Sequence, residues 1–153
     1  MPRSRGASAR RRIRAAVVAG VLAVAASVLT GCTNPGPTFD QAVAQGFTAV
    51  ETARLAVELE LEDRTFANTT TTTLEDARRE LVDAASAVSE TDATSAADAA
   101  LRADLLDALG LGVHAVNQAL DAMAGIGSLD AVEPALEDAA AALDDLGAPG
   151  GTR

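Results

Sequence analysis

The sequence predicts an all-α protein, built as a small antiparallel bundle of about four helices. Tryptophan and tyrosine are absent and only three phenylalanines occur, whereas residues that favour helices, above all alanine and leucine, are abundant. Apolar residues recur at steps of three or four along four segments, which is the spacing of one helix face. Short connections between these segments favour antiparallel neighbours whose apolar stripes share one core.

The first helix is predicted to begin at Thr38, which can form a capping box with Gln41, and to end near Arg64. The run from Asn68 to Thr73 lacks an apolar period and is rich in β-branched threonine, so we expect a loop there. The second helix then begins at Thr72 or Thr73 and ends at residues 89–92. The two apolar stripes are Phe39, Val43, Phe47, Val50, Val57 and Leu61, followed by Leu74, Ala77, Leu81, Ala85 and Val88.

The third helix is the longest, and Ser95 together with Asp98 can cap its start. Gly110 and Gly112 lie near its middle, where each costs about 1 kcal/mol relative to alanine. The pair indicates either a bend or a close approach of another helix, and we favour the close approach. Its apolar stripe consists of Leu101, Leu105, Leu109, Val113, Val116, Leu120 and Met123.

Two glycines, Gly125 and Gly127, are expected to end the third helix by adopting left-handed backbone conformations. Ser128 is the predicted N-cap of the last helix, and Pro134 is close enough to its start to be tolerated or to kink the first turn. Residues 148–153 are expected to form a flexible tail. The last stripe consists of Leu129, Val132, Leu136, Ala139, Leu143 and Leu146.

The segment before the predicted bundle has the three parts of an export signal. Six of the 12 arginines precede Ala15, and residues 15–29 are apolar but shorter than the roughly 20 residues that span a bilayer as a helix. The tetrapeptide Leu29-Thr30-Gly31-Cys32 follows. It resembles the lipobox of bacterial lipoproteins, in which an aliphatic residue, a small residue and glycine precede the cysteine.

The resemblance implies that residues 1–31 are a signal peptide, forming a signal helix before the bundle, and that diacylglycerol is attached to the Cys32 thiol. Residues 32–37 would then be the lipidated cysteine and a tether stiffened by two prolines, and residues 38–147 the bundle. The expected location is the extracytoplasmic face of the cell membrane. An uncleaved anchor, and a free or disulfide-bonded thiol at Cys32, are the alternatives. Of the two export routes, we favour general secretion over the twin-arginine route.

The charge of the chain divides at Cys32. All 22 acidic residues follow it, together with only six arginines and no lysine, which gives that part of the chain a formal charge of −16. Nucleic acids and anionic lipid headgroups are bound through basic residues that neutralise phosphate. We therefore expect no nucleic-acid partner.

The residues that catalysis or metal binding would need are sparse. His114 is the only histidine, so a site with two histidine ligands is excluded, and a solvent-facing or structural role is expected for it. The Gly-x-Ser-x-Gly nucleophile motif and a glycine-rich phosphate loop are both missing. The acidic groups at residues 58–63 and 144–145 lack the spacing of a calcium loop, although weak cation binding stays open. We therefore predict a protein that is not an enzyme, with no catalytic residues, cofactor or metal.

These observations favour a non-catalytic helical interaction module in the cell envelope, anchored in the membrane through Cys32, with another envelope protein as a candidate partner. The alternative is a carrier that binds an apolar ligand or lipid within the bundle, which the glycines of the third helix and the small core residues suggest. A secreted enzyme with a site made only of carboxylates is the third hypothesis, and it requires at least two buried acids in one cleft.

Overall fold

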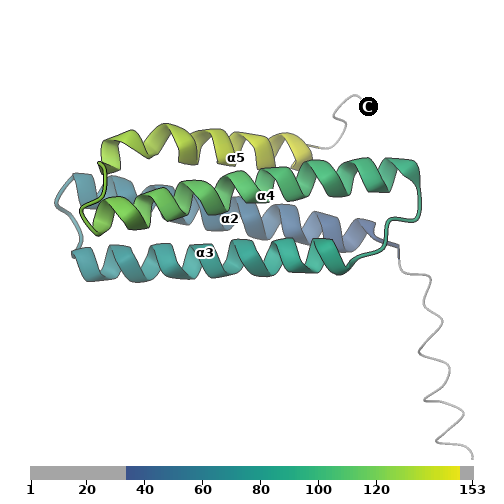
Figure 1. Ribbon diagram of the computed structural model, residues 1–153, viewed down its shortest axis with the longest axis horizontal. Helices are drawn as coiled ribbons and strands as arrows, with labels where there is room; N and C mark the ends of the chain where they lie inside the picture. The colour runs from purple at the N-terminus through teal and green to yellow at the C-terminus, as the bar shows by residue number, and fades with distance from the viewer. Residues whose placement is uncertain (1–33, 149–153) are drawn as a thin grey trace, which may run out of the picture. The chain divides into compact units, whose positions relative to one another are not determined.

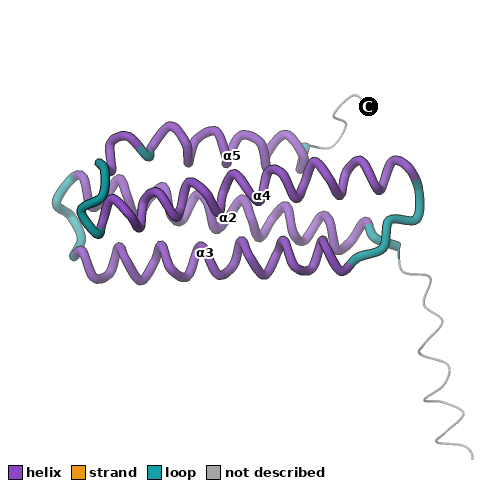
Figure 2. The backbone as a smooth tube through the Cα atoms, viewed as in Figure 1, coloured by secondary structure: helices purple, strands orange, loops and turns teal. Residues whose placement is uncertain are grey.

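The computed structural model describes residues 34–148. Within this range the chain forms four α-helices and one short 3-10 helix, without strands, which confirms the predicted all-α bundle (Figures 1 and 2). The predicted signal peptide, the lipobox and Cys32 lie outside the described residues, as does all of the predicted tail beyond Ala148. The elements are α2 (Gly36–Leu61), α3 (Ala67–Glu90), α4 (Ala96–Met123), η1 (Leu129–Ala131) and α5 (Glu133–Gly147).

Helices that follow one another along the chain run antiparallel and pack side by side (Figure 1). Helix α2 contacts α3 on one side and α5 on the other, and α4 closes the arrangement by contacting all three of the others. Within residues 34–148, α3 and α5 do not touch, so they occupy opposite corners. Helix α5 has 15 residues against 26 in α2 and 28 in α4, and it covers only part of their length.

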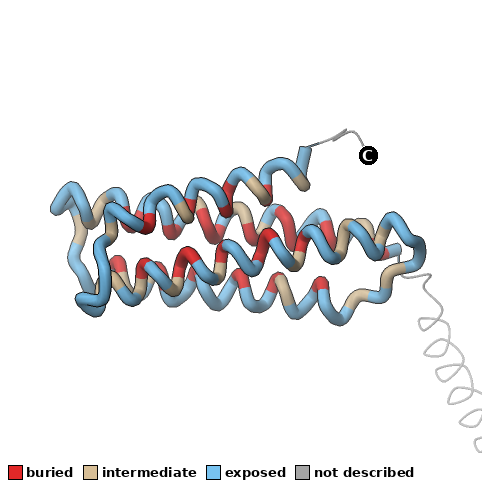
Figure 3. Tube along the Cα trace, turned by 45° about the horizontal axis from the view of Figure 1, so that its top comes forward, coloured by how far each residue is buried: buried red, intermediate tan, exposed pale blue. Residues whose placement is uncertain are grey.

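The core consists of leucines, valines and alanines together with one phenylalanine, and all four α-helices contribute buried residues to it (Figure 3). The predicted stripes supply most of it, including Phe39, which is 1% exposed. The stripes differ from the core at Leu61, which is 39% exposed at the end of α2, and they leave out nine buried alanines, among them Ala84. Six leucines are completely buried: Leu74, Leu81, Leu105, Leu109, Leu136 and Leu143.

The loop predicted over residues 68–73 is wrong, because α3 begins at Ala67 and contains the whole threonine run. Three of these threonines donate their hydroxyl hydrogen bonds to the backbone carbonyl four residues earlier, at 2.9 Å each. Thr70 is buried, and its hydroxyl donates to the Glu60 carboxylate of α2 at 2.7 Å. These threonine hydroxyls are satisfied within or beside the helix. The low helix propensity of threonine is therefore outweighed by the packing of α3.

The capping box predicted at Thr38 and Gln41 is also wrong, since α2 begins earlier, at Gly36. Proline fits this first turn because its fixed φ suits a helix and its missing N–H is not needed there. The Asn34 side-chain oxygen accepts a hydrogen bond from the Gly36 N–H at 3.1 Å. The predicted tether therefore loses its last two residues to the helix.

The predicted cap of α4 is confirmed, because the Ser95 hydroxyl oxygen accepts a hydrogen bond from the Asp98 N–H at 3.0 Å. Gly125 and Gly127 have φ values of +86° and +97°, which confirms the predicted left-handed end of this helix. The cap predicted at Ser128 is wrong. Ser128 precedes η1 and makes no backbone cap, and α5 begins later, at Glu133, with Pro134 in its first turn.

Two glycines allow close contact between helices. A Cβ atom added to Gly112 would lie 3.0 Å from Val50 and 3.1 Å from Leu81, so the predicted close approach is confirmed at this position. Gly110 has no neighbouring atom within 4 Å and therefore has no such role. Gly46 of α2, which sequence reasoning missed, packs more closely still, with a Cβ position 2.5 Å from Leu109.

Candidate functional site

A groove of about 730 Å³ runs along the line where α2 and α3 meet. A volume of this size lies within the range of 300–1,000 Å³ that is usual for binding sites. Six residues of α2 and four of α3 line it, and the groove is open to solvent along its outer side. These residues, called the α2–α3 groove below, are Gln41, Ala44, Gln45, Thr48, Ala49, Thr52, Thr73, Asp76, Ala77 and Glu80.

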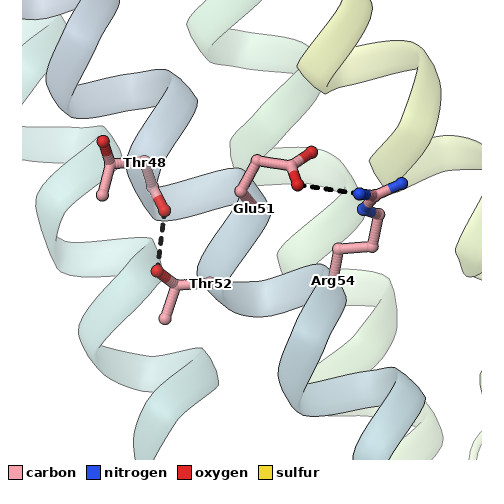
Figure 4. A network of polar contacts seen from close by, with 4 residues as sticks. All are labelled: Thr48, Glu51, Thr52 and Arg54. Carbon is pink, nitrogen blue, oxygen red and sulfur yellow. Dashed lines mark hydrogen bonds and ion pairs between the residues drawn. The ribbon is translucent and has the colours of Figure 1, made fainter.

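The walls of the α2–α3 groove consist largely of alanine and threonine. The Thr48 hydroxyl donates to the Ala44 carbonyl at 2.8 Å, and the Thr52 hydroxyl donates to the Thr48 carbonyl at 2.7 Å (Figure 4). Thr73 on the opposite wall donates in the same way to its own helix. Because these hydroxyl groups donate to their own helices, the small side chains line a shallow groove.

The polar groups of the groove connect its two helices and give it a negative character. The Gln45 amide donates to the Glu80 carboxylate and also to the Glu80 carbonyl across the gap between α2 and α3. The Asp76 carboxylate forms an ion pair with Arg79 at 2.7 Å, and this hydrogen bond raises the pKa of the arginine. The lining itself contains two carboxylates and no arginine.

Two smaller concavities flank the groove along α2. One, of about 540 Å³, lies between α2 and α5 and includes Asp40, Ala44 and Phe47. The other, of about 380 Å³, lies on α2 itself and shares Thr48 and Thr52 with the groove. On that side of α2, Glu51 and Arg54 form an ion pair at 2.8 Å (Figure 4). The outer surface of α2 is therefore hollowed along most of its length.

His114 lies exposed on α4, with Nε2 at 3.1 Å from the side-chain nitrogen of Gln118. It is absent from the lining of the α2–α3 groove, which α2 and α3 alone supply. The structure thus places the only histidine of the chain on the surface, away from this groove.

Two of the acidic residues near the end of α2 have local partners. Glu60 accepts the hydrogen bond from buried Thr70, and Glu62 forms an ion pair with Arg64 at 2.8 Å. Among residues 34–148, no three histidine, cysteine or acidic side chains gather as a metal site would require. These acidic side chains thus make structural contacts, one with the first turns of α3 and one within the connection between α2 and α3.

Little in the sequence indicated the α2–α3 groove. Ala44, Thr48 and Thr52 follow one another at intervals of four residues, which places them on one face of α2. This run of small residues was the only sign of the groove in the sequence. A groove forms there because Thr73 and Ala77 of α3 lie opposite these residues.

No helix among the described residues combines the length and the apolar character needed to cross a membrane. Comparison with protein-family models, curated proteins and solved structures finds no significant match to this chain.

Proposed function

We propose that this protein is a lipid-anchored, non-catalytic interaction module on the extracytoplasmic face of a cell membrane. The observation that carries the proposal is the tetrapeptide Leu29-Thr30-Gly31-Cys32, which resembles a lipobox and stands just ahead of the bundle. Diacylglycerol on Cys32 would insert two acyl chains, and two chains suffice for stable anchoring. The chain would then be held at the membrane without a spanning helix.

The start of α2 supports a bundle that is held close to its anchor. Gly36, where α2 begins, is only four positions after Cys32. Four extended residues reach at most about 14 Å. A partner would therefore meet this bundle within a short distance of the membrane surface.

The polar groups of the α2–α3 groove support binding over catalysis. Glu80 is engaged by Gln45 and Asp76 by Arg79, so both carboxylates have a nearby hydrogen-bond donor. Both carboxylates lie at exposed positions in an open groove, whereas catalytic groups act in sites from which water is excluded.

Lipidation is tested by expressing the full chain in a bacterium supplied with an alkyne-bearing fatty acid and measuring the intact mass of the extracted protein. The expected product begins at Cys32 and carries the mass of diacylglycerol. A Cys32→Ser variant should lose the label, whereas Thr33→Ser, one residue beyond the lipobox, should keep it. Labelling of the serine variant at position 32, or a mature chain that begins elsewhere, contradicts the proposal.

The alternative function, a carrier for an apolar ligand inside the bundle, has less support from the packing. Val50 and Leu81 occupy the space beside Gly112, and Leu109 occupies the space beside Gly46. These glycines bring helices together and do not line a hollow. Native mass spectrometry of gently extracted protein distinguishes the two functions, because a carrier would retain a bound mass that a packed module would lack.

A further inference from the structure

We infer that the α2–α3 groove is a docking site for an amphipathic helix of a partner protein, one with small residues on its contact face and lysine or arginine along its flanks. This deepens the proposed function by naming the surface and the kind of partner, and it rests on that function.

The shape of the groove fits a helix. Its α2 wall extends from Gln41 to Thr52, which at 1.5 Å per residue is about 17 Å or three helical turns. Ala44 and Thr48 on this wall, with Ala77 opposite, are small enough for a third helix axis to lie within the usual packing distance of about 8–10 Å. A peptide that binds as an added β-strand would need a free strand edge, and residues 34–148 contain no strand.

The charge of the groove selects a basic partner. Asp76 and Glu80 line it, and the two concavities that adjoin it on α2 add Asp40, Asp144, Glu51 and Glu58. Arg79 pairs with Asp76 and Arg54 with Glu51, so the six carboxylates exceed their paired arginines by four. Flanking lysines or arginines on a docked helix would meet these carboxylates on both sides. A second copy of this chain would bring the same excess of acidic residues and be repelled, as would an anionic lipid surface.

The groove lacks a covering helix within the described chain. Helix α5 packs on α2 and α4 but does not reach α3, so it leaves this side of the bundle uncovered. No other helix within residues 34–148 lies over it, so the groove is open to an occupant from outside this range.

The test uses the full chain, purified in neutral detergent, and a fluorescein-labelled helical peptide of about four turns with an alanine face and lysine flanks. Fluorescence anisotropy measures Kd against the wild type, and titration of detergent alone gives the background. Thr48→Arg fills the trough and adds a positive charge at an exposed position, so Kd should rise at least about tenfold. Ala141→Arg makes the same charge change at an exposed position of α5, outside the groove, and should alter Kd by less than about twofold.

A second measurement locates the peptide directly. A photoreactive residue on its alanine face should form adducts within residues 41–52 and 73–80, and a peptide with glutamate in place of lysine should not bind. Circular dichroism of Thr48→Arg establishes that the variant remains helical, and Glu80→Gln provides a second variant that leaves the walls of the groove unfilled. The Glu80→Gln change should also weaken binding.

Three results would overturn the inference: no binding up to about 1 mM peptide, equal weakening by the Thr48 and Ala141 variants, or adducts outside the two lining segments. The Cys32→Ser variant separates this inference from the proposed anchor. It should lose the lipid and still bind the peptide with unchanged Kd, so failure of docking and failure of lipidation give different results.

Discussion

Arg102 of α4 stabilises the C-terminal end of α3, and its removal is the sharpest test of how the bundle is held together. Its Nε donates to the Val88 carbonyl at 3.1 Å, and a terminal nitrogen donates to the Ser89 carbonyl. Helix α3 has no basic residue in its own last turn, so Arg102 supplies the positive charge that a helix C-terminus favours. The side chain thus connects two helices through backbone groups that would otherwise lack these donors.

The loss of stability expected for Arg102→Met depends on which hydrogen-bond donors remain for the two carbonyls. The Val88 carbonyl still accepts the N–H of Thr91, whereas the Ser89 carbonyl lies at an exposed residue where water can replace the guanidinium. Hydrogen bonds to charged groups contribute about 1.5–3 kcal/mol each when they are shielded from water. Because these two are partly exposed, we expect the substitution to lower the free energy of unfolding by about 1.5 kcal/mol in total. With an unfolding entropy of about 2.1 cal/mol/K per residue over the bundle, Tm should fall by about 6 °C.

Thermal unfolding followed by circular dichroism at the helix band measures this change. Arg54→Met is the matched control, because it removes the same charge from an exposed ion pair with Glu51 and should cost less than about 0.5 kcal/mol. Arg102→Lys should recover part of the loss, since lysine keeps the charge but cannot reach both carbonyls with a planar fork. Equal Tm values for the Arg102→Met and Arg54→Met variants would refute the capping role.

Gly110→Ala should raise the free energy of unfolding by about 0.8 kcal/mol, because the position is helical and open, and an unchanged urea midpoint would contradict this. Gly46→Val should lower it by about 2 kcal/mol, since the added atoms collide with a buried side chain of α4, and the same urea titration measures it. Hydrogen bonds from Thr94 and Ser95 lower the pKa of Asp98 from 3.8, so Asp98 stabilises the fold above that pH and loses this effect as pH falls through its folded-state pKa. The stability difference between wild type and Asp98→Asn should therefore be present at pH 7 and shrink in acid, and a difference that stays constant with pH would count against the assignment.

The features of the fold that were predicted correctly are local, since each is determined by residues within a single helix or at its end. The apolar stripes, the Ser95 cap and the left-handed residues Gly125 and Gly127 are properties of neighbouring residues along the chain. Helical spacing and the conformational freedom of glycine determine them before any tertiary contact forms. They sufficed to predict four helices in an all-α arrangement.

The parts that failed depend on contacts between helices. The threonine run was predicted as a loop because β-branched residues disfavour helices slightly, but burial of Thr70 against α2 and of Leu74 in the core outweighs that preference. The α2–α3 groove required knowing which faces of two helices meet. Of the two central glycines in α4, only Gly112 faces Val50 and Leu81, and sequence spacing alone did not separate it from Gly110.

The position of the α2–α3 groove along α2 affects how a partner would find it. The groove begins at Gln41, five residues after the start of the helix at Gly36, or about 8 Å along its axis. If Cys32 carries lipid, the groove and an envelope protein held in the same membrane would both be confined to a thin layer at the membrane surface. They would meet there more often than two molecules free in the surrounding solution. Tethering both molecules raises their effective concentration, so a weak contact between small side chains would be sufficient for stable association.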